Sequence, residues 1–82
     1  MWYLYIIETQ NGTLYTGITT DVERRFQEHL SNPKGAKYLK ANPPKTIVHT
    51  EEFENRSLAS KREWEVKKMS KKDKQRLIQG LK

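Results

Sequence analysis

Five side chains that can bind phosphate, hold a metal ion or move a proton occur at spacings that allow them to meet in the folded chain. They are Tyr5, Tyr15, Arg25, His29 and Glu63. Arg25 and His29 are four residues apart, so on a helix they share one face. Metal-assisted hydrolysis of a phosphodiester bond can be carried out by such a set around one sheet: two phenols, a guanidinium, an imidazole and a carboxylate.

Each group has a definite task in such a reaction. A carboxylate such as Glu63 suits Mg²⁺, which keeps most of its waters and takes its other ligands from phosphate. The fork of Arg25 stabilises charge that develops on the phosphate. A tyrosine can orient water or accept its proton, but with an ordinary pKa of about 10 it needs help from the metal or from His29.

Each residue, taken alone, also has a structural explanation. The tyrosines can be ordinary strand aromatics, Arg25 a surface arginine and His29 a helix residue with no task. Glu63 can simply pair with Lys67 one turn later, which stabilises a helix by only about 0.2–0.5 kcal/mol. The joint pattern, rather than any single residue, carries the functional hypothesis.

A hairpin is expected to position the two tyrosines. The stretches Trp2–Thr9 and Thr13–Thr19 are rich in aromatic and β-branched residues, which is typical of strands, and Gln10–Gly12 is a turn signal between them. Asn-Gly by itself favours a two-residue loop. That loop would place Tyr5 and Tyr15 on opposite faces of the sheet, because a one-residue slip turns every side chain over.

A three-residue loop gives a different register. With Gly12 in the left-handed conformation of a bulge, Tyr5 lies opposite Gly17 and Ile7 lies opposite Tyr15. The two tyrosines then become diagonal neighbours on one face. Only this register builds a shared site, so we predict the three-residue loop. Gly17 is expected either to mark a strand bulge or to keep the approach to the rings open.

The remaining elements follow from caps and periodicity. The sequence predicts a helix over about 21–31, with Thr20 as N-cap, Glu23 reaching back to it, and an apolar stripe of Val22, Phe26 and Leu30. A short basic segment from Gly35 to Ala41 and a third strand from Thr46 to Phe53 follow. Two more helices are expected: one capped by Asn55 or Ser57 that runs to about Met69 with Leu58 and Val66 on its apolar stripe, and a last one capped by Ser70 with Leu77, Ile78 and Leu81. The order β-β-α-(α)-β-α-α predicts an α+β fold with a three-stranded antiparallel sheet flanked by helices, in a single domain over residues 1–82.

The charge of the chain is unevenly distributed. The 82 residues carry a net charge of +6, yet residues 34–82 hold 14 basic and 6 acidic side chains, a net charge of +8. This asymmetry indicates a polyanionic partner, although a solvated helix face would have the same composition. Cysteine is absent, which excludes disulfides and thiolate zinc sites. With no signal peptide and no membrane span in the pattern, we expect a cytoplasmic protein.

The basic middle of the chain is the expected substrate contact. Lys34, Lys37 and Lys40 can line phosphates, and Tyr38 offers a ring on which a base can stack. A mobile charged loop is the alternative, above all for Lys34. The eight basic residues between 61 and 76 are expected to include both solvated and phosphate-facing side chains, which the sequence does not separate.

Several of these motifs together resemble a known family. The chain is similar to the GIY-YIG nuclease domain at Tyr5-Ile6, Tyr15-Thr16-Gly17, Glu23-Arg24-Arg25-Phe26 and His29. It is similar to the small, single-domain bacterial branch of that family in two strings, LYTGITTDVERRFQEH (14–29) and GAKYL (35–39). The resemblance implies DNA cleavage that depends on one divalent ion, Mg²⁺ or Mn²⁺. It gives Tyr5, Tyr15, Arg25 and His29 catalytic roles and makes Glu63 the metal ligand, with Glu65 as a competitor.

Two functions remain open at this point. The first is a metal-dependent DNA endonuclease in repair, recombination or DNA uptake, acting on duplex, branched or single-stranded DNA. The alternative is a nucleic-acid-binding module of the same fold with weak or no cleavage; an RNA-binding ribosomal role is more remote. We expect a monomer with no small-molecule cofactor and no membrane partner.

Overall fold

The structure, a computed structural model, describes residues 1–31 and 37–80. Strands β1 (Trp2–Thr9), β2 (Leu14–Thr19) and β3 (Pro44–Phe53) form one antiparallel sheet in the order β2-β1-β3. The helices are α1 (Val22–Ser31), α2 (Lys37–Ala41), α3 (Arg56–Lys67) and α4 (Lys71–Ile78). The predicted α+β fold and its element order, β-β-α-α-β-α-α, are confirmed.

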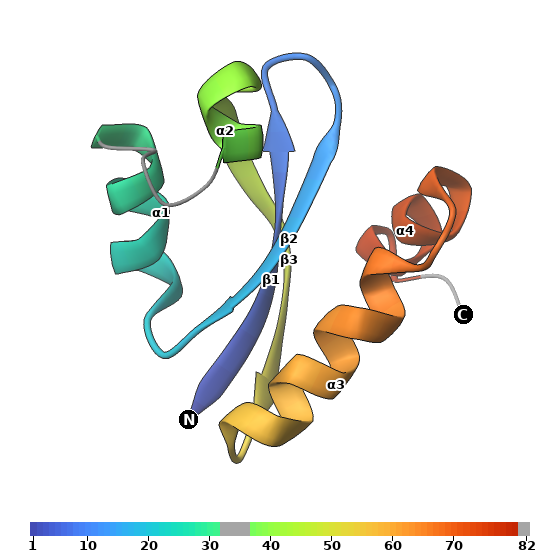
Figure 1. Cartoon of the computed structure of the whole chain (residues 1–82). Helices are drawn as coiled ribbons and strands as arrows, with labels where there is room; N and C mark the ends of the chain where they lie inside the picture. The colour runs from blue at the N-terminus through green and yellow to red at the C-terminus, as the bar shows by residue number, and fades with distance from the viewer. Residues whose placement is uncertain (32–36, 81–82) are drawn as a thin grey trace.

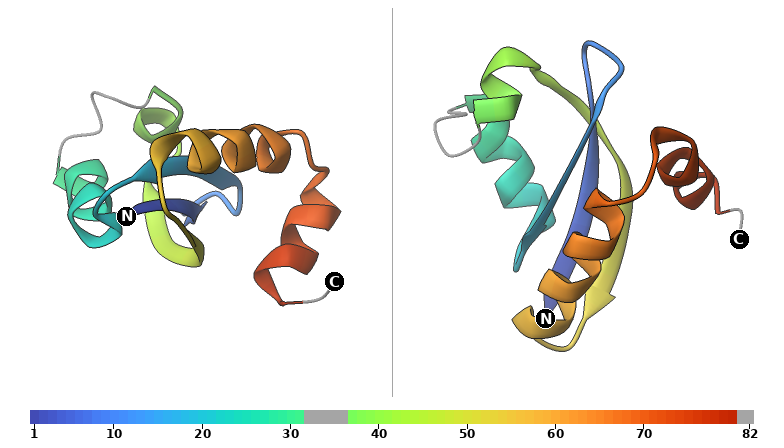
Figure 2. Two further views of the ribbon diagram at one scale, coloured as in Figure 1. Left: turned by 90° about the horizontal axis from the view of Figure 1, so that it is seen from below. Right: turned by 45° about the vertical axis from the view of Figure 1, so that its right-hand side comes forward.

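The helices cover both faces of the sheet. Helices α1 and α2 lie on one side, and α3 and α4 lie on the other (Figure 1; Figure 2 gives two further views). Because side chains alternate along a strand, β1 supplies both cores. Tyr5 and Ile7 pack with Leu39 on the α1 side, whereas Leu4 and Ile6 pack with Val66 on the α3 side.

The hairpin has the register that places both tyrosines on one face. Tyr5 lies opposite Gly17, and Ile7 lies opposite Tyr15. Gly12 has a φ of 78°, and its backbone N–H donates to the Thr9 carbonyl at 3.0 Å. This register and the positive φ of Gly12 confirm the predicted three-residue loop. Glycine suits this position because it takes the left-handed conformation without steric cost.

The start of α1 differs from the expectation. Asp21, not Thr20, is the capping residue, since its carboxylate accepts a hydrogen bond from the Arg24 backbone N–H at 3.1 Å. The Thr19 hydroxyl accepts in turn from the Asp21 backbone N–H at 3.2 Å. A carboxylate caps as well as a hydroxyl and also gains from the positive end of the helix dipole. The prediction of a capping box between Thr20 and Glu23 was wrong.

The other caps agree with the sequence. The Asn55 side chain accepts from the Leu58 backbone N–H at 2.9 Å, and the Ser70 hydroxyl accepts from the Asp73 backbone N–H at 3.1 Å. Strand β3 begins at Pro44 instead of Thr46, because Pro44 already pairs with Thr9 and proline is tolerated at the first residue of an edge strand.

Two leucines of the expected helical stripes are solvent-exposed. Leu30 is 49% exposed, and its neighbour His29 takes the buried position in α1. Leu58 is 45% exposed, while Ala59 holds the buried position at the start of α3. Helix α3 ends at Lys67 rather than about Met69. The expected contribution of Leu81 lies outside the described residues. In the described part of the chain, no helix has the length and apolar character needed to cross a membrane.

Candidate active site

A buried hydrogen bond joins the first strand to the first helix. The Tyr5 hydroxyl on β1 lies 3.1 Å from His29 Nε2 on α1, and the two residues are 3% and 2% exposed. Helix α1 is held against the sheet by Val22 and Phe26, which pack on the core around Tyr5. The apolar stripe of the helix thus carries His29 to the phenol.

The second tyrosine extends this pair toward solvent. The Tyr15 ring centroid is 6.4 Å from that of Tyr5 and 5.7 Å from that of His29, which it meets edge-on. On its other side the Tyr15 ring stacks with Tyr38 of α2, with centroids 6.1 Å apart and an interplanar angle of 24°. These four rings form what we call the aromatic cluster.

Gly17 is required by the Tyr5 ring itself. A Cβ atom at Gly17 would lie 2.5 Å from the Tyr5 hydroxyl oxygen and 2.6 Å from the ring carbon that bears it. Real Cβ atoms essentially never approach so closely, so any side chain here would displace the phenol. The space next to Gly17 was expected to keep the approach to the rings open, but the Tyr5 ring itself fills it.

Arg25 and Glu63 shift the pKa of the Tyr5 phenol in opposite directions. Burial is the main reason why the pKa of Tyr5 rises to about 12, and the charges of Tyr15 and Glu63 add to this rise. The Arg25 guanidinium works in the other direction and lowers the pKa of Tyr5. Glu63 belongs to α3, the helix that packs on β2, and it is close enough for its charge to act on Tyr5.

The imidazole of the cluster is neutral at pH 7. Burial lowers the pKa of His29 below its ordinary 6.5, and the positive charge of Arg25 lowers it further, while Glu28 opposes the shift. Arg25 is half-buried and contacts the Glu28 carboxylate at 3.3 Å. With Tyr5 protonated and His29 unprotonated, the buried pair carries no charge of its own at neutral pH.

The two glutamates of α3 point to different partners. The Glu63 carboxylate, 25% exposed, pairs with Lys67 Nζ at 3.4 Å. Glu65, 45% exposed, pairs with Arg62 at 3.4 Å instead. The ion pair between Glu63 and Lys67, which the sequence analysis offered as the structural explanation, is therefore present, and it lies next to the aromatic cluster.

Only some of the residues predicted to contact the substrate lie at the aromatic cluster. Tyr38 reaches the cluster by stacking on Tyr15. Lys37 and Lys40 are exposed on the same short helix α2, where their contact with a substrate stays a prediction. The predicted contact of Lys34 lies outside the described residues.

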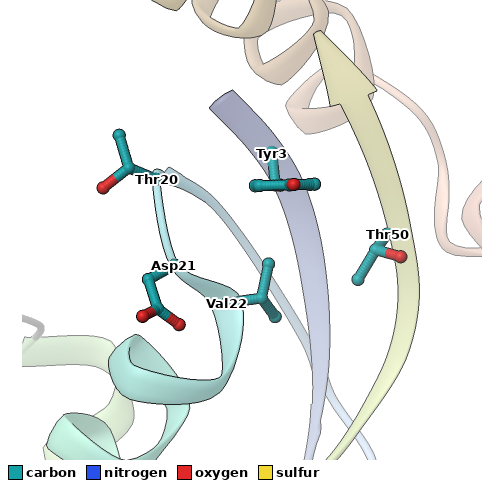
Figure 3. Close-up of a pocket in the computed structure, with 5 residues that line it drawn as sticks. All are labelled: Tyr3, Thr20, Asp21, Val22 and Thr50. Carbon is teal, nitrogen blue, oxygen red and sulfur yellow. The ribbon is translucent and has the colours of Figure 1, made fainter. Parts of the chain in front are cut away.

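A larger hollow on the α1 side has a different character. It measures about 470 Å³ and is lined by Tyr3, Thr20, Asp21, Val22 and Thr50. Figure 3 shows Asp21 and Val22 at the first turn of α1, with Tyr3 and Thr50 on the neighbouring strands. The only charged lining residue is the acidic Asp21, so this hollow is unsuited to a phosphate.

Comparison with known proteins decides the family. A family model described as the GIY-YIG catalytic domain matches residues 1–77. The chain belongs to the GIY-YIG family. Two similar proteins are the UPF0213 protein DP2720 of Desulfotalea psychrophila, 45% identical over 96% of this chain and 72% of that protein, and the UPF0213 protein YhbQ of Escherichia coli, 49% identical over 94% and 76%. The GIY-YIG domain is a nuclease-like fold, although neither relative's name states a reaction.

A solved structure supports the same assignment. The solution NMR structure of the UPF0213 protein BH0048 from Bacillus halodurans is 41% identical to this chain, with a TM-score of 0.61. The match covers 96% of this chain and 84% of that one. The GIY-YIG relationship therefore extends over nearly the whole chain, and it implies a nucleic-acid substrate.

The donor set restricts the metal ions that this GIY-YIG domain can hold. Among the described residues, no three His, Asp or Glu side chains gather in a cluster able to bind a metal. A site with Glu63 as its single protein ligand fits Mg²⁺, which binds through one or two carboxylates together with waters and substrate phosphates. The same site would not suit Zn²⁺, which needs three or four protein ligands.

Two of the eight basic residues between 61 and 76, which the sequence did not separate into solvated and phosphate-facing side chains, lie near the site. Lys67 and Lys74, from α3 and α4, line one pocket together with Tyr15 and Tyr38. Lys67 follows Glu63 by four residues, so its direction was foreseeable, but nothing in the sequence points Lys74 toward β2. A separate charged group, formed by His49, Glu51 and Arg62, lies on the α3 side of the sheet.

Proposed function

We propose that the protein is a metal-dependent endonuclease that hydrolyses phosphodiester bonds in DNA. The observation that supports this most directly is the buried hydrogen bond between Tyr5 and His29, with Arg25 close enough to influence the pKa of both. Membership of a family with a nuclease-like fold and the net charge of +8 over residues 34–82 agree with it. Tyr15 completes the site as the less buried ring beside the pair of Tyr5 and His29.

Arg25 and Glu63 bind the substrate and the ion in this proposal. The guanidinium of Arg25 holds the scissile phosphate and stabilises the charge that develops on it. Glu63 supplies the single carboxylate for a divalent ion, Mg²⁺ or Mn²⁺. When bound, such an ion neutralises charge on the phosphate and lowers the pKa of a water molecule.

Tyr5 and His29 form a proton path. The pKa of about 12 keeps the Tyr5 hydroxyl protonated at pH 7, so it orients the attacking water rather than acting as a free phenolate. As the water attacks phosphorus, its proton moves to the Tyr5 oxygen while the Tyr5 proton moves to Nε2 of His29. The P–O bond to the leaving strand breaks in the same step, and the departing oxygen takes up a proton from solvent water. The lowered pKa of His29 keeps this nitrogen available as an acceptor at neutral pH.

The choice of Glu63 over Glu65 rests on electrostatics. The charge of Glu63 acts on Tyr5, whereas Glu65 is the more exposed of the two and contacts Arg62. Replacing one well-placed electrostatic group commonly lowers a rate by about 10²–10³. We therefore expect Glu63→Ala to lose that factor, and the matched variant Glu65→Ala to retain cleavage.

The test is a cleavage assay on labelled duplex, forked and single-stranded DNA with Mg²⁺, with Mn²⁺ and with EDTA. Circular dichroism of each variant confirms that the fold survives. Failure to cleave any of these substrates with either ion contradicts the proposal. Loss of activity in Glu65→Ala but not in Glu63→Ala shows that the metal ligand is assigned wrongly.

A second candidate function is a nucleic-acid-binding module with weak or no cleavage. The observation that favours it is the ion pair between Glu63 and Lys67, because an ammonium group at 3.4 Å competes with a metal ion for the carboxylate. DNA binding in EDTA together with no cleavage in either metal is the result that supports this candidate.

A further inference from the structure

A pocket lies beside the outer edge of the sheet, next to the aromatic cluster. It measures about 190 Å³ and is lined by Leu14, Tyr15, Thr16, Tyr38, Lys67 and Lys74. These residues come from β2, α2, α3 and α4, so both helical layers contribute. The pocket shares Tyr15 with the site around Tyr5, and Lys67 connects it with Glu63 through their ion pair. We refer to it as the edge pocket.

One wall of the edge pocket is aromatic and accessible. The Tyr38 ring, whose residue is 42% exposed, continues the stack that begins with Tyr15. Every nucleobase has a flat face that packs on such a ring regardless of its sequence. The volume is below the 300–1,000 Å³ typical of pockets for drug-sized ligands, which suits a single base rather than a base pair.

Another part of the lining of the edge pocket is positively charged. Lys67 and Lys74 both line it, and in the described residues the pocket has no acidic lining residue. Nucleic-acid phosphates are the natural counterpart of two ammonium groups beside an aromatic surface. Charge and shape together therefore favour a nucleotide over an apolar ligand.

Thr16 adds a polar group whose hydrogen bonding is incomplete. The residue is 4% exposed, and among the described residues its hydroxyl oxygen has no hydrogen-bond partner. Thr16 lies opposite Ile6, so its side chain is on the α3 side of β2, where Lys67 also lies. A buried hydroxyl without a partner is unfavourable because it has given up its hydrogen bonds to water, and a ligand with a polar edge can supply the missing partner.

We propose that the edge pocket binds one unstacked nucleotide of the substrate strand. Its base packs against Tyr38, its polar edge bonds with the Thr16 hydroxyl, and its phosphate lies between Lys67 and Lys74. As a subsite of the reaction, this rests on the proposed function, but binding at the pocket does not require cleavage. The ion pair to Glu63 places the bound nucleotide next to the scissile phosphate.

The test compares two strands with equal numbers of phosphates, a short thymidine strand and an abasic strand, in EDTA. Fluorescence anisotropy gives the affinity for each. The wild-type protein is expected to bind the thymidine strand at least about five-fold more tightly, which is the lower end of the effect of stacking one base. Tyr38→Ala is expected to lose this preference, and the matched variant Tyr38→Phe is expected to keep it.

Two further variants separate the roles of base and phosphate. Thr16→Val, which removes the hydroxyl at similar size, is expected to reduce the preference, and Thr16→Ser is expected to keep it. Lys74→Ala is expected to weaken binding of both strands equally and to flatten the salt dependence by about one unit. These measurements do not depend on a cleavage activity, so they hold even if the proposed reaction fails.

The proposal is overturned if the wild-type protein binds both strands equally, or if Tyr38→Ala keeps the preference for bases. An affinity that depends on Lys74 but not on Tyr38 or Thr16 assigns the pocket to phosphate alone, which also contradicts nucleotide recognition. Circular dichroism verifies that each variant is folded before its affinity is interpreted.

Discussion

Each face of the sheet has a histidine that is hydrogen-bonded to another side chain, but the charged groups around the two histidines differ. On the α1 side, His29 is bonded to the neutral phenol of Tyr5, with Arg25 nearby. On the α3 side, His49 Nε2 lies 2.8 Å from a carboxylate oxygen of Glu51. We call His49, Glu51 and Arg62 the charge cluster, because the His49 imidazole and the Arg62 guanidinium both contact the Glu51 carboxylate.

The charge cluster is complete in itself. Arg62 donates to both oxygens of Glu51, at 2.9 and 3.3 Å. Burial acts to raise the pKa of Glu51, but the hydrogen bonds from Arg62 and His49 outweigh it and lower the pKa below its usual value. An incoming phosphate would have to displace a well-bonded carboxylate, so nothing in this arrangement favours a ligand.

The contrast indicates how a structural cluster differs from a reactive one. Arg25 has the more exposed Glu28 as its carboxylate contact, whereas Arg62 is held by a carboxylate that is only 22% exposed. A loosely held guanidinium next to a neutral phenol can exchange its partner for a phosphate. We therefore expect changes on the α1 side to alter activity, and changes in the charge cluster to alter stability.

The largest difference is expected for Arg25→Ala. Losing the group that binds the phosphate should lower the cleavage rate by about 10²–10³, with little change in the midpoint of thermal unfolding. The control is Arg24→Ala, a neighbour whose side chain is 77% exposed. Equal loss of activity in the two variants would mean that general charge, rather than the position of Arg25, is responsible.

Gly17→Ala should affect both properties. The new Cβ atom would lie 2.5 Å from the Tyr5 hydroxyl oxygen, so the buried ring must move and its hydrogen bond to His29 must break. Overpacking of this kind typically destabilises a protein by about 1–3 kcal/mol. Denaturant unfolding and cleavage kinetics measure the two losses; Gly80→Ala, at an exposed residue of positive φ near the chain end, controls for backbone effects. Full activity in Gly17→Ala would contradict a role for the bonded phenol.

Arg62→Ala should lower the stability of the protein and leave its activity unchanged, which is the reverse of the result expected for Arg25→Ala. It leaves Glu51 without its principal partner, and we expect a loss of about 1 kcal/mol in unfolding free energy, since the pair is partly solvated. Cleavage per folded molecule should be unchanged well below the unfolding temperature. Lys61→Ala, at an exposed residue of the same helix, is the matched control. A stable but inactive Arg62→Ala protein would erase the distinction between the two clusters.

The smallest effect is a dependence on pH that only one histidine should produce. The pKa of His29 is lowered, so the acceptor nitrogen is lost only as pH falls through a value below 6.5. Stability should decrease in the same window, because the unfolded chain then binds a proton more readily than the native one. Rate profiles should keep this acidic limb in His49→Gln, whereas the low residual rate of His29→Gln, which lacks the proton acceptor, should no longer show it. The opposite result would exchange the roles of the two histidines.

Local signals predicted much of this molecule, because they act over a few residues. The alternation of the strands, the caps at Asn55 and Ser70, and the requirement for Tyr5 and Tyr15 to share a face gave the correct elements and register. They led to Thr20 as the cap of α1, where the structure has Asp21, since both side chains can accept the same bond. Here the carboxylate has the advantage of its charge.

What the sequence could not give depends on packing between distant elements. The approach of Lys74 to Tyr15 follows from how α4 packs against the sheet, and no local pattern encodes it. The charge cluster depends on the register shift between Ile6 and Ile7 in the pairing of β1 with β3. This irregularity sets which residues of β3 face α3, and only the assembled sheet reveals it.

The turn at Gln10–Gly12 is the place where extra chain can be added without turning β2 over. A pairing shifted by one residue would place Ile18 or Thr16 opposite Tyr5 in place of Gly17, and so exchange the inward and outward sets of β2. A residue added inside the loop leaves these pairs unchanged, because the loop takes up the extra length at a small entropic cost. Insertions into this turn, whether for a tag, a sensor or a fused domain, are therefore expected to preserve the site, whereas insertions within β1 or β2 are expected to disrupt it.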